Sequence, residues 1–237
     1  MLPRLATAFF LAASLRGCVA YEYEHEFWLR VDGSGSVNVT GRPELWAAFK
    51  GLSPDDSEGS AIRRAARALF EGSGLRVRRV ALTTRKGQPY LFVAADFRDV
   101  NRIGGTAAFP DLRITLRPEG GRLLLDGTWS PPPRTSARAP SGDGDGLMAV
   151  RFHLPSRIYD HKSAPLGVER GNILGWRQGV GQALEGRSLD FGATLDSRSI
   201  LGSTVALFAT AIVVALAILA AAFALLVRRG RRRVAPG

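Results

Sequence analysis

The chain has 237 residues, of which 46% are hydrophobic and 22% charged, a balance typical of a folded domain and not of a disordered chain. A single cysteine excludes a disulfide scaffold and a metal site built from clustered cysteines. Of the net charge of +11, seven positive charges lie near the two ends, which leaves +4 in the middle. That excess is too small to predict nucleic-acid binding.

The chain begins with a pattern typical of a secretory signal peptide. Arg4 precedes an uncharged apolar run over 5–15. As a helix this run would be roughly 16 Å long, about half the thickness of a hydrocarbon core. A charged start, a short apolar run and small residues after it predict a signal peptide over 1–17 rather than a permanent span.

The segment 15–18, with the sequence Leu-Arg-Gly-Cys, has the spacing of a bacterial lipobox. In such a site the cysteine thiol receives diacylglycerol, and cleavage leaves the lipidated cysteine as the new N-terminus. Ordinary cleavage after Ala20 is the alternative. The position of the chain's one cysteine at this point favours lipidation of Cys18.

A β-hairpin is predicted directly after the signal peptide. Residues 21–31 alternate between apolar and mostly charged side chains, a period of two that indicates a half-buried strand. An Asp-Gly-Ser-Gly turn follows at 32–35, and Val37 and Val39 continue the alternation in a second strand.

Apolar residues then recur at helical spacing over 62–70, which predicts an amphipathic helix that begins near Ser57 and ends at Gly72 or Gly74. The outer face of this helix carries three arginines, which we expect to contact anionic headgroups at a membrane surface; a solvated face is the alternative. They are Arg63, Arg64 and Arg67.

The rest of the middle region indicates strands with one long polar interruption. The segment 130–146 is rich in proline and glycine and is expected to be a flexible insert. Together the segments predict an α+β domain, in which an antiparallel sheet of roughly eight strands packs against one main amphipathic helix. The further strand segments are 75–84, 88–97, 113–116, 122–129, 147–154, 171–177 and 188–195.

A long apolar segment lies near the C-terminus. No residue from 199 to 227 is charged, and 205–227 alone gives about 35 Å of helix, enough to cross a hydrocarbon core of ~30 Å. A buried core helix is the alternative, but core helices are seldom this long or apolar on every face. We therefore expect a transmembrane helix over 199–227.

The residues after this helix set its predicted orientation. The tail 228–237 contains five arginines and no acidic residue, and positive residues beside a span are retained in the cytoplasm. The residues 18–198 are then an extracytoplasmic domain on a single-pass protein of the cytoplasmic (inner) membrane. The topology determinants are Arg228, Arg229, Arg231, Arg232 and Arg233.

Small residues in the predicted span lie at a spacing that permits close helix contact. Ala211 and Ala215 form one pair four residues apart, and Ala217 and Ala221 form another. A homodimer through the transmembrane helix is one interpretation. Chance in an alanine-rich segment is the other.

No catalytic motif is found in the sequence, and neither a cofactor nor a metal is predicted. The three histidines are far apart, and His25 falls on the apolar face of a strand, which is more typical of a core residue than of a metal ligand. Asp160 and His161 with Glu169 could supply a metal site or a general base, but a polar turn explains them equally well.

Three stretches resemble the LppM-like family of bacterial lipoproteins. They are the segment 17–22 with the hairpin after it, Phe-His-Leu-Pro-Ser at 152–156 and Gly-Asn-Ile-Leu-Gly-Trp at 171–176. The order of lipobox, outer α+β domain, single helix and basic tail is also similar to that family. The resemblance implies a membrane-attached domain that faces the cell envelope, and the founding member is associated with binding glycosylated phospholipids.

The leading hypothesis is a non-catalytic binding module for membrane lipid or another envelope component. A structural or assembly partner of another membrane protein is the alternative. An envelope hydrolase is the third hypothesis, and it requires Asp160, His161 or Glu169 to converge in a pocket.

Overall fold

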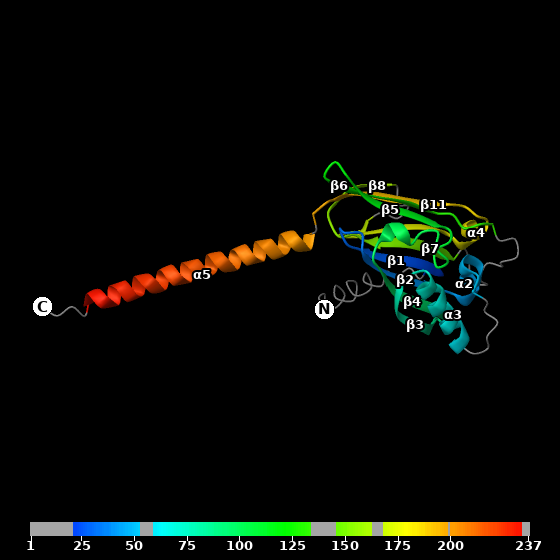
Figure 1. Ribbon diagram of the computed structural model, residues 1–237, viewed down its shortest axis with the longest axis horizontal. Helices are drawn as coiled ribbons and strands as arrows, with labels where there is room; N and C mark the ends of the chain where they lie inside the picture. Colours follow the sequence, from blue (N-terminus) through cyan, green and yellow to red (C-terminus); the bar gives the residue numbers. More distant parts are fainter. Residues whose placement is uncertain (1–20, 53–58, 134–145, 163–167, 199, 234–237) are drawn as a thin grey trace, which may run out of the picture.

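The computed structural model describes residues 21–52, 59–133, 146–162, 168–198 and 200–233. In these residues eleven strands form two sheets stacked as layers, and a long helix leaves the domain (Figure 1). The α+β class and the apolar C-terminal helix are confirmed. There are more strands than the eight or so expected, partly because two of them, with four and three residues, are too short to show an alternating pattern.

The larger sheet is antiparallel, as predicted, except at β1 and β7, which pair in parallel with Tyr23 opposite Met148. A parallel pair needs a long crossover connection, and alternation within each strand carries no information about such a pairing. The predicted hairpin is confirmed as β1 and β2, with Leu29 opposite Gly35. In spatial order the seven strands are β3 (Arg76–Arg85), β4 (Gln88–Phe97), β2 (Gly35–Gly41), β1 (Tyr23–Leu29), β7 (Leu147–His153), β10 (Ile173–Gly179) and β9 (Val168–Arg170).

The smaller sheet has four antiparallel strands and packs on the larger one through aromatic rings. Phe191 lies 5.2 Å from Phe152 and 5.9 Å from Trp176, measured between ring centroids. All three side chains are fully buried, so the main core lies between the two sheets. In spatial order the strands are β5 (Leu112–Glu119), β6 (Arg122–Trp129), β11 (Leu189–Asp196) and β8 (Ile158–His161).

Two helices pack against the strands β3 and β4. The predicted amphipathic helix is confirmed as α3 (Gly59–Gly72), which buries Ile62, Ala66 and Phe70, while the predicted start near Ser57 lies outside the described residues. Helix α2 (Pro43–Lys50) was not predicted, because eight residues are barely two turns and show little periodicity. The remaining short helices are η1 (Val100–Arg102) and α4 (Val180–Leu184).

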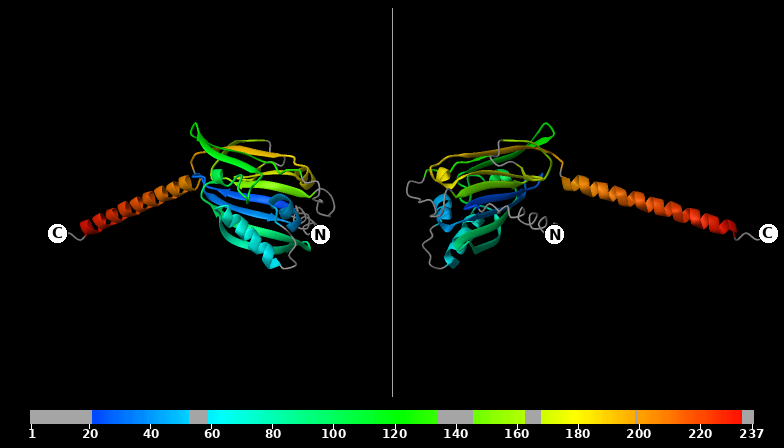
Figure 2. Two further views of the ribbon diagram at one scale, coloured as in Figure 1. Left: turned by 45° about the vertical axis from the view of Figure 1, so that its right-hand side comes forward. Right: turned by 180° about the vertical axis from the view of Figure 1, so that it is seen from behind.

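The last helix, α5 (Ile200–Arg233), extends away from both sheets in every view (Figure 2). Its segment Thr204–Leu226 has a mean hydropathy of 2.8 and is not buried at all. It is therefore long and apolar enough to cross a membrane and is not a core helix of this domain. The predicted orientation of the span stays a prediction, and Cys18 and the rest of the signal region lie outside the described residues.

Candidate functional site

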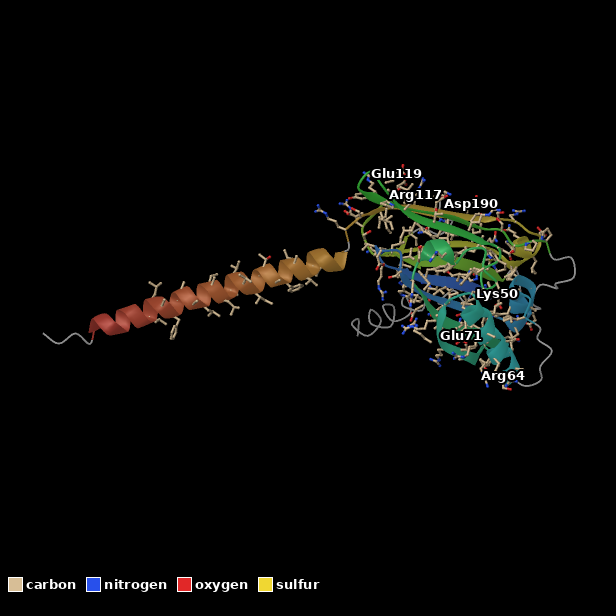
Figure 3. The ribbon with its side chains drawn as sticks, in the orientation of Figure 1. Lys50, Arg64, Glu71, Arg117, Glu119 and Asp190 are labelled. Carbon is tan, nitrogen blue, oxygen red and sulfur yellow. The ribbon has the colours of Figure 1, made fainter. Side chains whose placement is uncertain are left out.

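One end of the domain, here called the α5 end, gathers the turns next to the start of α5. β11 leads into α5, and its last residue, Asp196, pairs with Arg122, so the β5–β6 hairpin lies at this end. The η1 segment connects that hairpin to the β1–β2 turn, because the Val100 backbone N–H donates to the Gly33 carbonyl and the Leu116 N–H to the Asn101 side chain. In Figure 3 the labelled Arg117 and Glu119 lie close to α5, whereas Arg64 lies at the opposite end.

A groove of about 800 Å³ lies between the β1–β2 turn, the end of β4 and the α3–β3 turn. Gly74 shapes its rim, since the backbone there has a positive φ of 78° that an L-residue rarely adopts. The buried side chains of Leu75 and Phe97 contribute apolar surface. Arginines and a serine line the rest, namely Arg30, Ser34, Arg76 and Arg98.

The two acidic residues that line the groove, Asp96 and Glu71, form ion pairs with arginines. Asp96 accepts from Arg76 at 2.6 Å and lies 3.0 Å from Arg78 Nε, and Glu71 pairs with Arg67 at 3.1 Å.

Arg30 donates to the Ser34 hydroxyl at 3.2 Å, and neither Arg30 nor Arg98 forms an ion pair within the described part of the chain. Guanidinium groups present several donors that match phosphate or carboxylate, so the groove is suited to an anionic group.

The three arginines singled out on α3 are exposed, as their helical positions imply. They line a separate shallow hollow of about 270 Å³ with Ser60 and Val80. Of these residues, Arg64 is labelled in Figure 3 and lies far from the start of α5. Contact of Arg63, Arg64 and Arg67 with lipid stays a prediction.

A second polar cluster is enclosed in the core. Tyr23 and His25 are fully buried on β1, and the Tyr23 hydroxyl lies 3.4 Å from His25 Nε2. The His25 ring lies 5.5 Å from Phe109 and 5.9 Å from Trp129. Burial, with a smaller contribution from the charge of Lys50, holds the pKa of His25 well below its usual value of 6.5. His25 is therefore neutral in the folded domain at pH 7.

Lys50, the last residue of α2, is the third member of the core cluster. Its ammonium donates to the Ala108 carbonyl and lies 4.5 Å from the centroid of the Phe109 ring. Burial lowers the pKa of Lys50 to about 7, and the opposing effect of Asp111 is smaller. Sequence reasoning missed Lys50 because nothing in the pattern marks a helix-terminal lysine as buried.

Two residues of the hydrolase hypothesis, Asp160 and His161, line one hollow of about 180 Å³, and the hypothesis stays untested. Asp160 accepts from the backbone N–H of its neighbour His161 at 2.8 Å, and His161 Nδ1 lies 3.0 Å from the Lys162 carbonyl. The side chain of Glu169 is outside the described residues. Within the residues searched, no group of three or more His, Cys, Asp or Glu side chains could hold a metal ion.

Comparison with solved structures finds a likeness at low sequence identity. No protein family and no curated protein matches the sequence. The NMR structure of the folded domain of Mycobacterium tuberculosis LppM is similar over 73% of this chain and 88% of that one, with 14% sequence identity and a TM-score of 0.41. The predicted resemblance is thus confirmed only as structural similarity, and the function has to be inferred from this chain's own residues.

Proposed function

We propose that the chain is a membrane-anchored, non-catalytic binding module on the outer side of the cytoplasmic membrane. Its ligand is a lipid or another envelope component that presents a phosphate or carboxylate group. The observation that supports this is the groove at the α5 end, where Arg30 and Arg98, which form no ion pair within the described residues, lie beside the apolar surface of Leu75 and Phe97. Arginines beside apolar surface suit an amphiphile with an anionic head.

The position of the groove supports a ligand drawn from the membrane surface. The groove lies at the α5 end, and the membrane-crossing segment of α5 begins at Thr204, only eight residues after Asp196. We therefore expect Arg30 and Arg98 to lie on the side of the domain that is nearest the bilayer surface. The charge of the two arginines also raises the local concentration of such anions.

Native mass spectrometry of the full chain in detergent micelles tests the proposal. We expect phosphatidylglycerol to bind more tightly than phosphatidylcholine, and the double variant Arg30→Ser/Arg98→Ser to lose about tenfold or more in affinity through two missing charge-assisted contacts. The matched control is Arg113→Ser/Arg187→Ser, which removes two exposed arginines outside the groove. Equal binding by the groove variant and the control would reject the groove as the site.

Assembly with another membrane protein is the second candidate function. The observation in its favour is that the apolar side chains of Thr204–Leu226 are all exposed in the isolated chain. Crosslinking in intact membranes separates the two candidates. A protein adduct through α5 that survives the groove substitutions would support assembly, and the absence of any adduct would count against it.

A further inference from the structure

An aromatic residue lies exposed beside the start of α5. Tyr159, on the edge strand β8, is 45% exposed, and in the described residues outside α5 it is the one large hydrophobic side chain that is strongly exposed. An exposed tyrosine alone needs no explanation, but this one lies within a cluster of charged groups.

Two arginines flank the Tyr159 ring. The guanidinium of Arg122 lies 4.5 Å from the ring centroid, and that of Arg157 lies 5.4 Å from it. The ring is also fixed at its far end, because the Tyr159 hydroxyl donates to Asp196 at 3.0 Å. Asp196 in turn donates its backbone N–H to the Arg157 carbonyl at 2.9 Å. Hydrogen bonds and ring contacts therefore hold the side chains of this cluster in a defined arrangement.

The cluster keeps a positive charge despite its one acid. The Arg198 backbone N–H donates to Asp196 Oδ1 at 2.8 Å, and this bond with that from Tyr159 lowers the pKa of Asp196, so its carboxylate stays ionised. Against this carboxylate stand the exposed Arg122, Arg157 and Arg198, while Glu119, opposite Arg122 in the β5–β6 hairpin, is paired with Arg117 at 3.2 Å. No ion pair of Arg122 or Arg157 is formed within the described part of the chain.

Chain connectivity places this cluster close to a membrane surface. Helix α5 begins at Ile200, and its membrane-crossing segment begins at Thr204. Thr204 follows Asp196 by eight residues. Even if the four residues before the helix were fully extended, the two positions would be at most roughly 20 Å apart. The headgroup region adds several ångströms to each side of the hydrocarbon core, so the cluster can reach it.

We propose that Tyr159, Arg122, Arg157 and Arg198 dock the domain on anionic headgroups of the bilayer that α5 enters. A tyrosine ring is suited to the boundary between headgroups and hydrocarbon, and arginines beside it attract anionic lipid. Docking would hold the α5 end against the membrane and keep the groove directed at its surface. The proposal rests on membrane insertion of α5 but not on a ligand in the groove.

Hydrogen exchange of the full chain in lipid nanodiscs tests this docking. Peptides that cover 119–122 and 157–161 should exchange about tenfold more slowly in nanodiscs that contain phosphatidylglycerol than in phosphatidylcholine alone. High salt should reduce the difference, because it screens exposed charges. Equal exchange of these peptides in the two lipids would overturn the proposal.

Two variants separate this docking from other effects. Arg122→Ser/Arg157→Ser/Tyr159→Ser should lose the lipid-dependent protection, whereas Arg63→Ser/Arg64→Ser/Arg67→Ser, with three arginines removed from α3, should keep it. Protection that persists in the first variant would contradict the proposal. Arg30→Ser/Arg98→Ser should also keep the protection, so loss of lipid binding in the groove and loss of docking at Tyr159 are measured independently.

Discussion

The basic side chains of the domain occupy two contrasting environments. Lys50 and His25 are enclosed among aromatic rings in the core, whereas Arg30, Arg98 and Arg122 are exposed at the α5 end. Burial removes a group from water and shifts its pKa, so the core pair couples folding to pH. Exposed arginines stay charged and contribute little to folding, which leaves them free to bind an anion. Basic side chains therefore make stability depend on pH in one region and, in our proposal, bind an anion in the other.

The largest expected effect is the pH dependence that Lys50 gives to stability. The pKa of Lys50 is about 7 in the folded domain and close to 10.5 when unfolded, so the unfolded chain holds more protons between these values. The free energy of unfolding should therefore rise with pH above 7, by about 1.4 kcal/mol per pH unit from this group. Lys50→Met should remove that slope, as measured by denaturant unfolding of the full chain in detergent.

The fluorescence of the buried tryptophans can be used to follow unfolding. The stability of Lys50→Met and of the unmodified chain is best compared between pH 7 and 9. Above that range Tyr23 interferes, because burial raises its pKa well above 10.0, so the unfolded chain ionises first and stability falls. An exposed lysine, Lys86, provides the control Lys86→Met, whose slope should equal that of the unmodified chain. A slope unchanged in Lys50→Met would show that this ammonium is solvated.

His25 should produce a second slope on the acid side. Its pKa is well below 6.5 when folded and near 6.5 when unfolded, so the unfolded chain takes up the proton first as the pH falls. Stability should decrease below pH 6.5 with a limiting slope of about 1.4 kcal/mol per pH unit. His25→Leu should flatten this part of the curve, as measured by denaturant unfolding of the full chain in detergent. A steep acid limb in His25→Leu would assign the slope to other groups.

Substitutions at the α5 end, unlike those of Lys50 and His25, should leave the stability of the domain nearly unchanged. Arg30→Ser/Arg98→Ser is expected to change the free energy of unfolding by less than about 0.5 kcal/mol per residue, since both side chains are exposed. Circular dichroism and denaturant unfolding of the full chain check this at pH 7. A loss of several kcal/mol would mean that these arginines stabilise the turns of the α5 end. Weaker lipid binding by the variant would then be explained by partial unfolding and not by the loss of a binding contact.

Much of the large sheet could be predicted from local patterns. Alternation over 21–31 marked β1, and the spacing of Ile62, Ala66 and Phe70 marked α3, because each element buries one face and the period of that face is visible in the sequence. The division into two sheets was not visible. It depends on the pairing of β1 with β7 and of β6 with β11, contacts between distant segments that local periodicity does not encode.

The candidate sites were less predictable for the same reason. The sequence drew attention to Arg63, Arg64 and Arg67 because they are neighbours on one helix. The groove instead combines Arg30 with Arg98, and the docking cluster combines Arg122 with Tyr159, residues that only the register of the sheets brings together. These four side chains lie on four different segments of the chain, so no sequence motif includes them together.

The smallest expected effect concerns the exposed pair of Arg67 and Glu71 on α3. The two side chains are 44% and 51% exposed and lie one helical turn apart, with 3.1 Å between Arg67 Nη1 and Glu71 Oε1. Pairs of this kind stabilise a helix by about 0.3–0.5 kcal/mol, and salt weakens them. A double-mutant cycle of Arg67→Ala and Glu71→Ala should give a coupling energy in this range that declines at high ionic strength. A coupling energy above about 1 kcal/mol that did not change with salt concentration would contradict this prediction. It would show that the exposed face of α3 is less solvated than its exposure indicates, so its arginines would resemble the buried Lys50 more than the arginines of the α5 end.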